Sequence, residues 1–313
     1  MDIKVYDSKD FPAYLPKLNH LYDDLFAGGK GFRAKLIRML ATSLQLPAKT
    51  ELLLAQTIEF IHNASLLHDD LVDRSHLRRG KTTAWLKFSP EYAVLAGDYL
   101  LARVMVNLSS HGNLKLVQYT AEVISDLLEG EWLQDSLIQD FSLELSQLDR
   151  VHNLKTSSLF KWCLRAPFIS IERYEPFLHT TLQEMGTILG QLFQRSDDLL
   201  DFDIRNFEGK AILGDLKSGY LNSFGAFLTR SWSADAREKL KSIRTLPELY
   251  ALCEGKEKFV VRVNEFDEGN LFLIQLYQHH LQTLTQFLSE NEKPLLQQLQ
   301  PLSEVLYWRK KPE

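Results

Sequence analysis

The stretch Glu51–Asp73, ELLLAQTIEFIHNASLLHDDLVD, decides the fold class that we predict for this chain. It contains neither glycine nor proline, and its apolar residues recur at helical spacing, as at Leu54, Ile58 and Ile61. This pattern predicts one long helix with an apolar side that packs against the rest of the protein.

A polar stripe follows another side of this helix. At steps of three, four and four residues the helix presents His62, Ser65, Asp69 and Asp73. With Asp70 the stripe ends in three carboxylates within five residues, where like charges repel and aspartate disfavours the helix. Carboxylate oxygens without cysteine suit a hard cation such as magnesium, which bridges carboxylates to phosphate oxygens. The alternative is a solvated helix end.

A second cluster of the same kind follows later in the chain. The segment GQLFQRSDDLLDF carries Asp197, Asp198 and Asp201, with Gln194 one turn earlier. The two clusters start 128 residues apart, and both end long apolar helices. If these ends face each other, two acidic rims hold several divalent ions, which bind a diphosphate and help it to leave.

The composition indicates an ordinary globular protein. Of 313 residues, 45% are hydrophobic and 25% are charged, and no linker divides the chain, so we expect a single domain over residues 1–313. The net charge of −5 gives no general attraction to nucleic acid or to an anionic membrane. Cys163 and Cys253 stand alone without a CxxC motif, which predicts neither a zinc site nor a disulfide framework.

Helices are expected throughout. Alternation at period two is absent, so no strand is predicted, and the pattern over 222–307 predicts three or four further helices. The first residues, MDIKVYDSKDF, lack the basic and apolar blocks of a signal peptide, and no apolar run approaches a membrane span. We expect a cytoplasmic protein in a reducing compartment, with no stable membrane insertion.

Basic residues accompany the first cluster. Lys30 and Arg33 lie at the start of a helix predicted over 32–46, where backbone N–H groups favour anions, so the two cations can grip a diphosphate. The alternative is a glycine turn with solvated charges. Arg78 and Arg79, just beyond the carboxylates, either pair with them or hold the outer oxygens of a diphosphate. We favour the second use, because the carboxylates are needed for metal and the guanidinium fork fits phosphate.

Polar residues also interrupt apolar helices. In a helix predicted over 142–168, Lys155 and Thr156 interrupt the apolar face. In an interior position they need an anionic or hydrogen-bond-accepting partner, which is either a substrate phosphate or a carboxylate of the clusters. Asp98, within AGDYLLARVM, is expected to be a buried structural carboxylate.

The glycine-rich segment 203–219 is predicted to be a loop. With Lys210 and Lys217 it either closes over bound phosphate or remains a solvated surface loop.

Taken together, these motifs resemble those of the trans-isoprenyl (polyprenyl) diphosphate synthases, closest to their bacterial octaprenyl and longer-chain branch. The matching segments, in the right order across residues 25–225, are GGKGFRA, HNASLLHDDLVDRSHLRRGKTT, GDYLLA, KTSSLF, GQLFQRSDDLLDF and GKAILGDLKSG. The resemblance implies an all-α, single-domain isoprenoid-synthase-type helical bundle around a deep central cavity, usually a homodimer. The C-terminal helices would occupy residues 226–307.

The resemblance also implies the reaction and the metal. Such enzymes condense isopentenyl diphosphate with an allylic diphosphate, head to tail and trans, using magnesium, here expected as three ions per active site. The ligands implied are Asp69, Asp73 and Asp197. The remaining aspartates, Asp70, Asp198 and Asp201, would support them, and Lys155 joins all six as a catalytic residue.

Both substrate sites are implied in the same way. Side chains expected to hold the allylic diphosphate are Arg78, Lys155, Thr156, Gln194 and Lys210. Side chains expected to hold isopentenyl diphosphate are Lys30, Arg33, His62 and Arg79. His62 taken alone is more typical of a satisfied core histidine.

Product length is predicted from the helix geometry. Ser65 lies four residues, about 6 Å of helix, before Asp69 on the same face. Both Ser65 and its neighbour Ala64 are small, so a growing tail can pass them, and the product should be longer than farnesyl. Trp132 or Trp162 either forms the cavity floor or belongs to the core, and we favour the core.

Some positions depart from the family pattern. Gly31 stands where an arginine is usual, Ala34 where a proline is usual, and Tyr220 where a lysine is usual. The missing lysine puts loop closure in doubt, and Lys217 is a candidate substitute.

Two other functions are compatible with the motifs. A silent or regulatory subunit of a heteromeric prenyltransferase would have no need of both aspartate motifs. A terpene cyclase or diphosphate lyase would have no need of the second diphosphate site at Lys30, Arg33 and Arg79.

Overall fold

Helices make up nearly all the regular structure of the protein. The computed structural model describes residues 10–26, 31–78, 80–206 and 211–309, with the backbone alone for 22–26. In chain order the helices of the first half are α1 Pro16–Phe26, α2 Phe32–Ser43, α3 Ala48–Val72, α4 Ala84–Lys87, α5 Pro90–His111, α6 Leu114–Ser136, α7 Leu145–Lys155 and α8 Ser157–Ser170. Those of the second half are α9 Pro176–Leu200, α10 Gly214–Lys217, α11 Ser223–Thr229, α12 Ala234–Glu238, α13 Leu246–Leu252, α14 Lys256–Leu284, α15 Pro294–Leu299 and α16 Leu302–Trp308.

Contacts between residues divide the chain into two compact units, each assembled from separate stretches. The first unit consists of Met1–Ser125, Trp162–His179 and Ser289–Leu295. The second consists of Asp126–Lys161, Thr180–Leu288 and Leu296–Glu313. The expectation of one domain over the whole chain, around a central cavity, stays a prediction.

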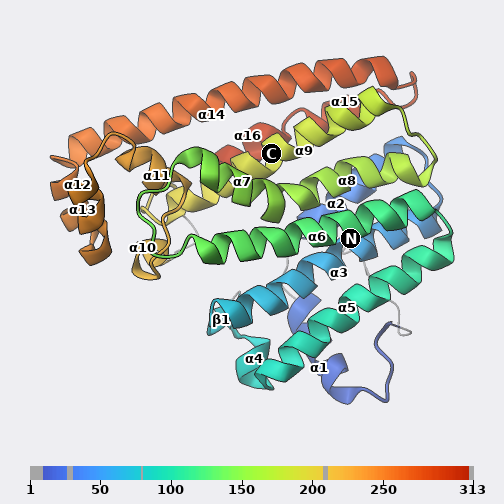
Figure 1. Ribbon diagram of the computed structural model, residues 1–313. Helices are drawn as coiled ribbons and strands as arrows, with labels where there is room; N and C mark the ends of the chain where they lie inside the picture. Colours follow the sequence, from blue (N-terminus) through green and yellow to red (C-terminus); the bar gives the residue numbers. More distant parts are fainter. Residues whose placement is uncertain (1–9, 27–30, 79, 207–210, 310–313) are drawn as a thin grey trace. The chain divides into compact units, whose positions relative to one another are not determined.

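In the first unit, α3 is the central helix, packed along α5 and against α2 (Figure 1). Leu54, Ile58 and Ile61 are almost completely buried, which confirms the apolar face predicted from the sequence. α5 is well delimited: the Ser89 side chain accepts a hydrogen bond from a backbone N–H of its first turn, and Gly112 ends it with a φ of 87°.

The first unit also contains a buried ion pair. Asp10 is fully buried and accepts hydrogen bonds from Arg103, at 2.8 Å from Nη2 and 3.1 Å from Nε. Gln56 and Asn107 donate to the same carboxylate. A buried charge with this many donors ties residue 10 to α3 and α5.

Short elements were missed by periodicity. Leu77–Arg78 (β1) and Lys81–Thr82 (β2) form a small antiparallel ladder, so the expectation of no strand was wrong at this place. Two-residue strands are too short for alternation to show. Residues 222–307 also hold more helices than the three or four expected, because α11, α12, α13, α15 and α16 have only five to seven residues each.

Two expectations of burial were wrong. Asp98 has 63% of its side chain exposed, and Trp132 is 80% exposed. Leu95, one turn before Asp98, and Leu128, one turn before Trp132, are also exposed. Apolar residues on these helix faces therefore do not show that the face is buried in the core. Trp162, by contrast, is fully buried and donates to the Thr120 hydroxyl at 3.0 Å, which confirms its core role.

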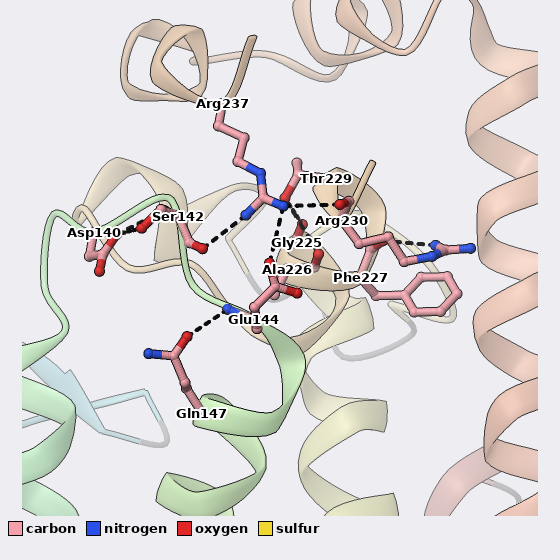
Figure 2. A network of polar contacts seen from close by, with 10 residues as sticks. All are labelled: Asp140, Ser142, Glu144, Gln147, Gly225, Ala226, Phe227, Thr229, Arg230 and Arg237. Atoms are coloured by element: carbon pink, nitrogen blue, oxygen red, sulfur yellow. Dashed lines mark hydrogen bonds and ion pairs between the residues drawn. The ribbon is translucent and has the colours of Figure 1, made fainter. Parts of the chain in front are cut away.

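In the second unit, buried Arg237 joins three elements (Figure 2). Its Nη1 donates to the Ser142 carbonyl at 2.9 Å, and its Nη2 donates to the Arg230 carbonyl at 3.1 Å. Nη2 also lies 3.4 Å from a carboxylate oxygen of Glu144, the residue that caps α7. One guanidinium thus fixes the start of α7, whose last residue is Lys155.

Cys163 and Cys253 are both free thiols, and both are buried. Within the described residues, no helix combines the length and the apolar character needed to cross a membrane.

Candidate active site

The first aspartate motif lies where α3 ends. Asp73 caps the helix, its N–H donating to the Asp69 carbonyl at 2.8 Å, and the Ser75 N–H donates to the Asp70 carbonyl at 2.9 Å. The three carboxylates differ in exposure. Asp70 is 5% exposed, Asp69 is half-buried and Asp73 is exposed.

Arg78 from β1 pairs with the buried member of this motif. Its Nε and Nη2 donate to the same oxygen of Asp70, at 2.9 and 2.5 Å. The pairing that we did not favour from the sequence is therefore formed. The expected role of Arg78 in holding the allylic diphosphate stays a prediction, and Arg79 lies outside the described residues.

The expected isopentenyl diphosphate site is described in part. Arg33 is the second residue of α2 and is half-buried, as is His62 in the middle of α3. α2 begins after Gly31, whose φ of 54° a side chain would disfavour, and the Ala34 N–H donates to the Glu59 carboxylate at 3.2 Å. Lys30 lies outside the described residues.

The two chain-length positions have different surroundings. Ala64 has no exposed surface, whereas Ser65 is half-buried and its hydroxyl donates to the His62 carbonyl at 2.9 Å. Ser65 is thus the more accessible of the two, on the same stripe as Asp69.

The second aspartate motif ends α9. The Asp197 side chain is 34% exposed, but Asp198 is only 3% exposed, and its carboxylate accepts three hydrogen bonds from Ser223 and Gln194. Its Oδ2 accepts from the N–H and hydroxyl of Ser223, at 2.9 and 2.5 Å, and its Oδ1 accepts from Gln194 at 2.9 Å. Burial raises the pKa of Asp198 above its ordinary value, although these donors act in the opposite direction.

The last aspartate of this motif lies beneath the segment that follows. Asp201 is fully buried, and its Oδ1 accepts from the Asp215 N–H at 3.2 Å. Asn222 joins both parts, donating to the Asp215 carboxylate at 2.8 Å and to the Asp198 carbonyl at 3.2 Å. These contacts flank Tyr220, where we expected a lysine from the resemblance.

The closing-loop residues are described only in part. Lys217 ends the four-residue helix α10, and its Nζ donates to the Ile212 carbonyl of the same segment at 2.9 Å. Its proposed substitution for the missing lysine stays a prediction. Lys210 lies outside the described residues.

The helix predicted over 142–168 is broken at Thr156, between α7 and α8. Lys155 forms an ion pair with Glu131, so its anionic partner belongs to neither aspartate motif, and that part of our expectation was wrong. The Thr156 hydroxyl donates to Gln194 at 3.0 Å, which joins two of the residues expected to bind the allylic diphosphate.

Two glycines let neighbouring helices approach this break. A Cβ on Gly190 of α9 would lie 2.4 Å from the Cα of Ser157, and one on Gly130 of α6 would lie 2.6 Å from the Lys155 side chain. Any larger residue would push the chain away from α9 or α6. The glycine of GQLF thus packs against a neighbour, as expected, and that neighbour is Ser157.

The donor set fits a hard divalent cation. Among the described residues, no group of three or more His, Cys, Asp or Glu side chains forms a metal site by itself. Each motif instead offers carboxylate oxygens only. Magnesium is commonly bound by one or two carboxylates, with diphosphate and water completing its shell. Asp69, Asp73 and Asp197 therefore remain the expected ligands, and the facing of the two motifs remains a prediction.

Sequence reasoning missed several residues around the second motif. Arg195 is buried and donates to both Asp149 oxygens at 2.8 Å and to Asn270 at 2.9 Å. Arg309, near the C-terminus, donates to Asp197 at 2.7 Å. The one local signal was a charged residue, Arg195, within an apolar helix. The partners of Arg195 and Arg309 are too distant in the sequence to be predicted from that signal.

Comparison with known proteins agrees with this fold. A sequence model of the polyprenyl synthetase family matches residues 15–248. The octaprenyl diphosphate synthase of Escherichia coli (strain K12) is 35% identical over 193 residues, which are 61% of this chain and 59% of that protein. The chain thus matches about three fifths of that relative's length.

Crystal structures with the same fold cover nearly the whole chain. A decaprenyl diphosphate synthase from Rhodobacter capsulatus superposes with a TM-score of 0.83 at 27% identity, over 96% of this chain and 92% of that one. A polyprenyl synthase from Caulobacter crescentus CB15, complexed with calcium and isoprenyl diphosphate, gives a TM-score of 0.76 at 25% identity, over 96% and 90%. The all-α fold class is confirmed. Because the family match covers well over half of the chain, this protein belongs to the polyprenyl synthetase family.

Proposed function

We propose that this protein is a metal-dependent trans-polyprenyl diphosphate synthase. It would extend an allylic diphosphate with isopentenyl diphosphate, head to tail, to a product longer than farnesyl diphosphate. Family membership and the similarity to long-chain synthases support the reaction class. The metal, the substrates, the residue roles and the homodimer are parts of the proposal.

One observation about the aspartates carries the proposal furthest. In each motif, the carboxylates expected to bind metal are the accessible ones: Asp69 and Asp73 in the first, Asp197 in the second. The aspartates expected to support them are buried, at 5% exposure or less, and are hydrogen-bonded within the fold: Asp70, Asp198 and Asp201. Burying carboxylates costs free energy unless donors satisfy them, so three buried and hydrogen-bonded aspartates support a built site over a simply solvated helix end.

The chemistry follows from charge. Bound magnesium would supply the positive charge that stabilises a departing diphosphate. The C–O bond of the allylic substrate breaks and its electron pair leaves with the diphosphate. The double bond of isopentenyl diphosphate then forms the new C–C bond, and a proton is lost to the released diphosphate. No side chain is needed as nucleophile.

The polypeptide would bind and orient both substrates. Thr156 and Gln194 already share a hydrogen bond, and Lys155 is held near them by Glu131. Together the end of α7 and the α9 residue Gln194 would offer a hydroxyl, a charge and an amide to the allylic diphosphate. Arg33 and His62 would hold isopentenyl diphosphate, and apolar walls would exclude water from the developing cation.

Incubation with radiolabelled isopentenyl diphosphate, farnesyl diphosphate and Mg²⁺ tests the proposal. Chromatography of the dephosphorylated products should reveal prenyl alcohols longer than fifteen carbons, absent when Asp69→Ala replaces the natural protein. Hydrocarbon from farnesyl diphosphate alone would indicate a cyclase or lyase instead. No turnover until a second prenyltransferase chain is added would indicate a subunit of a heteromeric enzyme.

A further inference from the structure

The C-terminal end of the described chain reaches the second aspartate motif. α16 ends at Trp308, and Arg309 follows with a φ of 51°. From there its Nη2 donates to Oδ1 of Asp197 at 2.7 Å and its Nε donates to the Ser196 hydroxyl at 3.0 Å. The Arg309 side chain is 17% exposed and that of Asp197 is 34% exposed. Two directed bonds from one planar group specify a position more closely than a solvated charge pair does.

Hydrogen bonds hold α16 in place for this contact. Tyr307, the residue two before Arg309, is fully buried and donates to Asp267 of α14 at 2.5 Å. Its hydroxyl also accepts from Asn270 at 3.0 Å. Asn270 in turn accepts from Arg195 of α9 at 2.9 Å. This chain of contacts links α16 through α14 to the helix that carries Asp197.

A second arginine reinforces the same segment. Arg205 donates to Asp267 at 2.9 Å, and its guanidinium lies 5.0 Å from the ring centre of Tyr307 and 4.8 Å from that of Trp308. Cation–π contact and ion pair together fix the two residues that precede Arg309. The contacts of Tyr307 and Trp308 therefore position Arg309 beside Asp197.

We propose that Arg309 is the built-in counter-ion of Asp197, a positioning residue that holds this carboxylate and sets the affinity of the second motif for divalent metal. The inference rests on the proposed function, because it takes Asp197 as a metal ligand. A guanidinium on Oδ1 and a divalent cation compete for the same negative charge. Metal binding at Asp197 must therefore weaken or displace the Arg309 contact, and the protein alone should bind metal less tightly than the carboxylate otherwise would.

Metal binding without turnover tests this proposal. Free Mn²⁺ is measured by electron paramagnetic resonance while the purified protein is titrated with Mn²⁺ alone. Arg309→Gln should raise Mn²⁺ affinity by about threefold to tenfold, the effect of one charge at a partly exposed site. Arg309→Lys, which keeps the charge, should stay within about twofold of the natural protein. Arg262→Gln, which removes a guanidinium paired with Glu265 on α14, is the matched control and should change nothing.

The same titration in an Asp197→Asn background tests the counter-ion role of Arg309 separately from the assignment of Asp197 as a metal ligand. The gain from Arg309→Gln should vanish there, because the carboxylate for which the cations compete is gone. Unchanged affinity in Arg309→Gln, or a gain that persists with Asp197→Asn, overturns the counter-ion role. If Asp197→Asn weakens Mn²⁺ binding while Arg309→Gln does not strengthen it, the inference fails and the proposed function stands. If Asp197→Asn leaves Mn²⁺ binding unchanged, the metal assignment fails as well.

Discussion

The guanidinium of Arg78 rests on one oxygen of Asp70, with Nε at 2.9 Å and Nη2 at 2.5 Å. The carboxylate is nearly buried, and the Arg78 side chain is 41% exposed. The pair therefore falls between a solvated surface pair and a buried one. It also links β1 to the last turn of α3, which orders the loop beyond the first motif.

Arg78→Gln should consequently lower the free energy of unfolding by about 1–2 kcal/mol, because Asp70 keeps its burial and loses its charged donor. A double-mutant cycle with Asp70→Asn, followed by urea denaturation, should give a coupling of about 1 kcal/mol. Arg38 and Glu51, 3.7 Å apart with side chains 50% and 28% exposed, form the control pair and should show almost none. A coupling near zero for Arg78 and Asp70 would mean that Arg78 is kept for substrate alone.

Substitution of an accessible aspartate and of a buried one should affect turnover and stability differently. Asp69→Ala removes a half-buried carboxylate and should reduce turnover at least roughly 100-fold, through lost charge stabilisation, while the protein stays folded. Asp198→Ala leaves the Ser223 and Gln194 donors without their acceptor inside the fold. It should cost about 2–3 kcal/mol of stability as well as activity.

Steady-state assays and chemical denaturation of both variants provide the measurement. Asp98→Ala is the matched control, since this carboxylate is 63% exposed and belongs to neither motif. It should change neither turnover nor stability appreciably. Near-normal turnover for Asp69→Ala would refute the metal assignment of the first motif.

Long elements could be predicted from the sequence, and short or long-range ones could not. The α3 helix could be predicted because its apolar residues repeat over many turns. Leu54 and Ile58 are buried, as this repeat predicts. The break at Thr156 could not be predicted, because the sequence around it contains neither glycine nor proline, and the glycines that approach it belong to α6 and α9. Trp132 shows the same limit, since an apolar stripe does not say whether it faces the core.

The two aspartate motifs could be found from local sequence, because the residues of each lie within five positions of one another. The hydrogen bond between Thr156 and Gln194 joins residues 38 positions apart, so no local pattern predicts it. Arg309 likewise acts 112 residues from its partner Asp197, and no periodicity connects them. Ion pairs of this kind depend on the tertiary fold alone.

Ser65 and Ala64 should respond differently to the same substitution. Ser65→Phe places a ring on the half-buried stripe one turn before Asp69, where it should block a growing tail and shorten the product. Ala64→Phe would force a ring into a site with no exposed surface, which should cost about 1–3 kcal/mol of stability. Product chromatography and thermal unfolding measure the two effects. An unchanged product distribution in Ser65→Phe would show that the tail takes another route.

The stability of the protein should depend on pH through His152. This side chain is 4% exposed on α7, and burial lowers its pKa to about 4. Asp149 opposes the shift, whereas the positive charges of Arg195 and Lys155 add to it. In the unfolded chain the imidazole returns to the ordinary pKa of about 6.5. Between these two values the unfolded chain binds a proton that the folded one does not.

The His152 contribution is therefore fully present above pH 6.5 and is lost as the pH falls towards 4, by about 3 kcal/mol in all. Urea unfolding at a series of pH values should show a shallower decline over this window in His152→Asn than in the natural protein, whatever the variant costs at neutral pH. Equal slopes for His152→Asn and the natural protein would mean that His152 takes up its proton without unfolding, so that the burial of its ring does not govern acid stability.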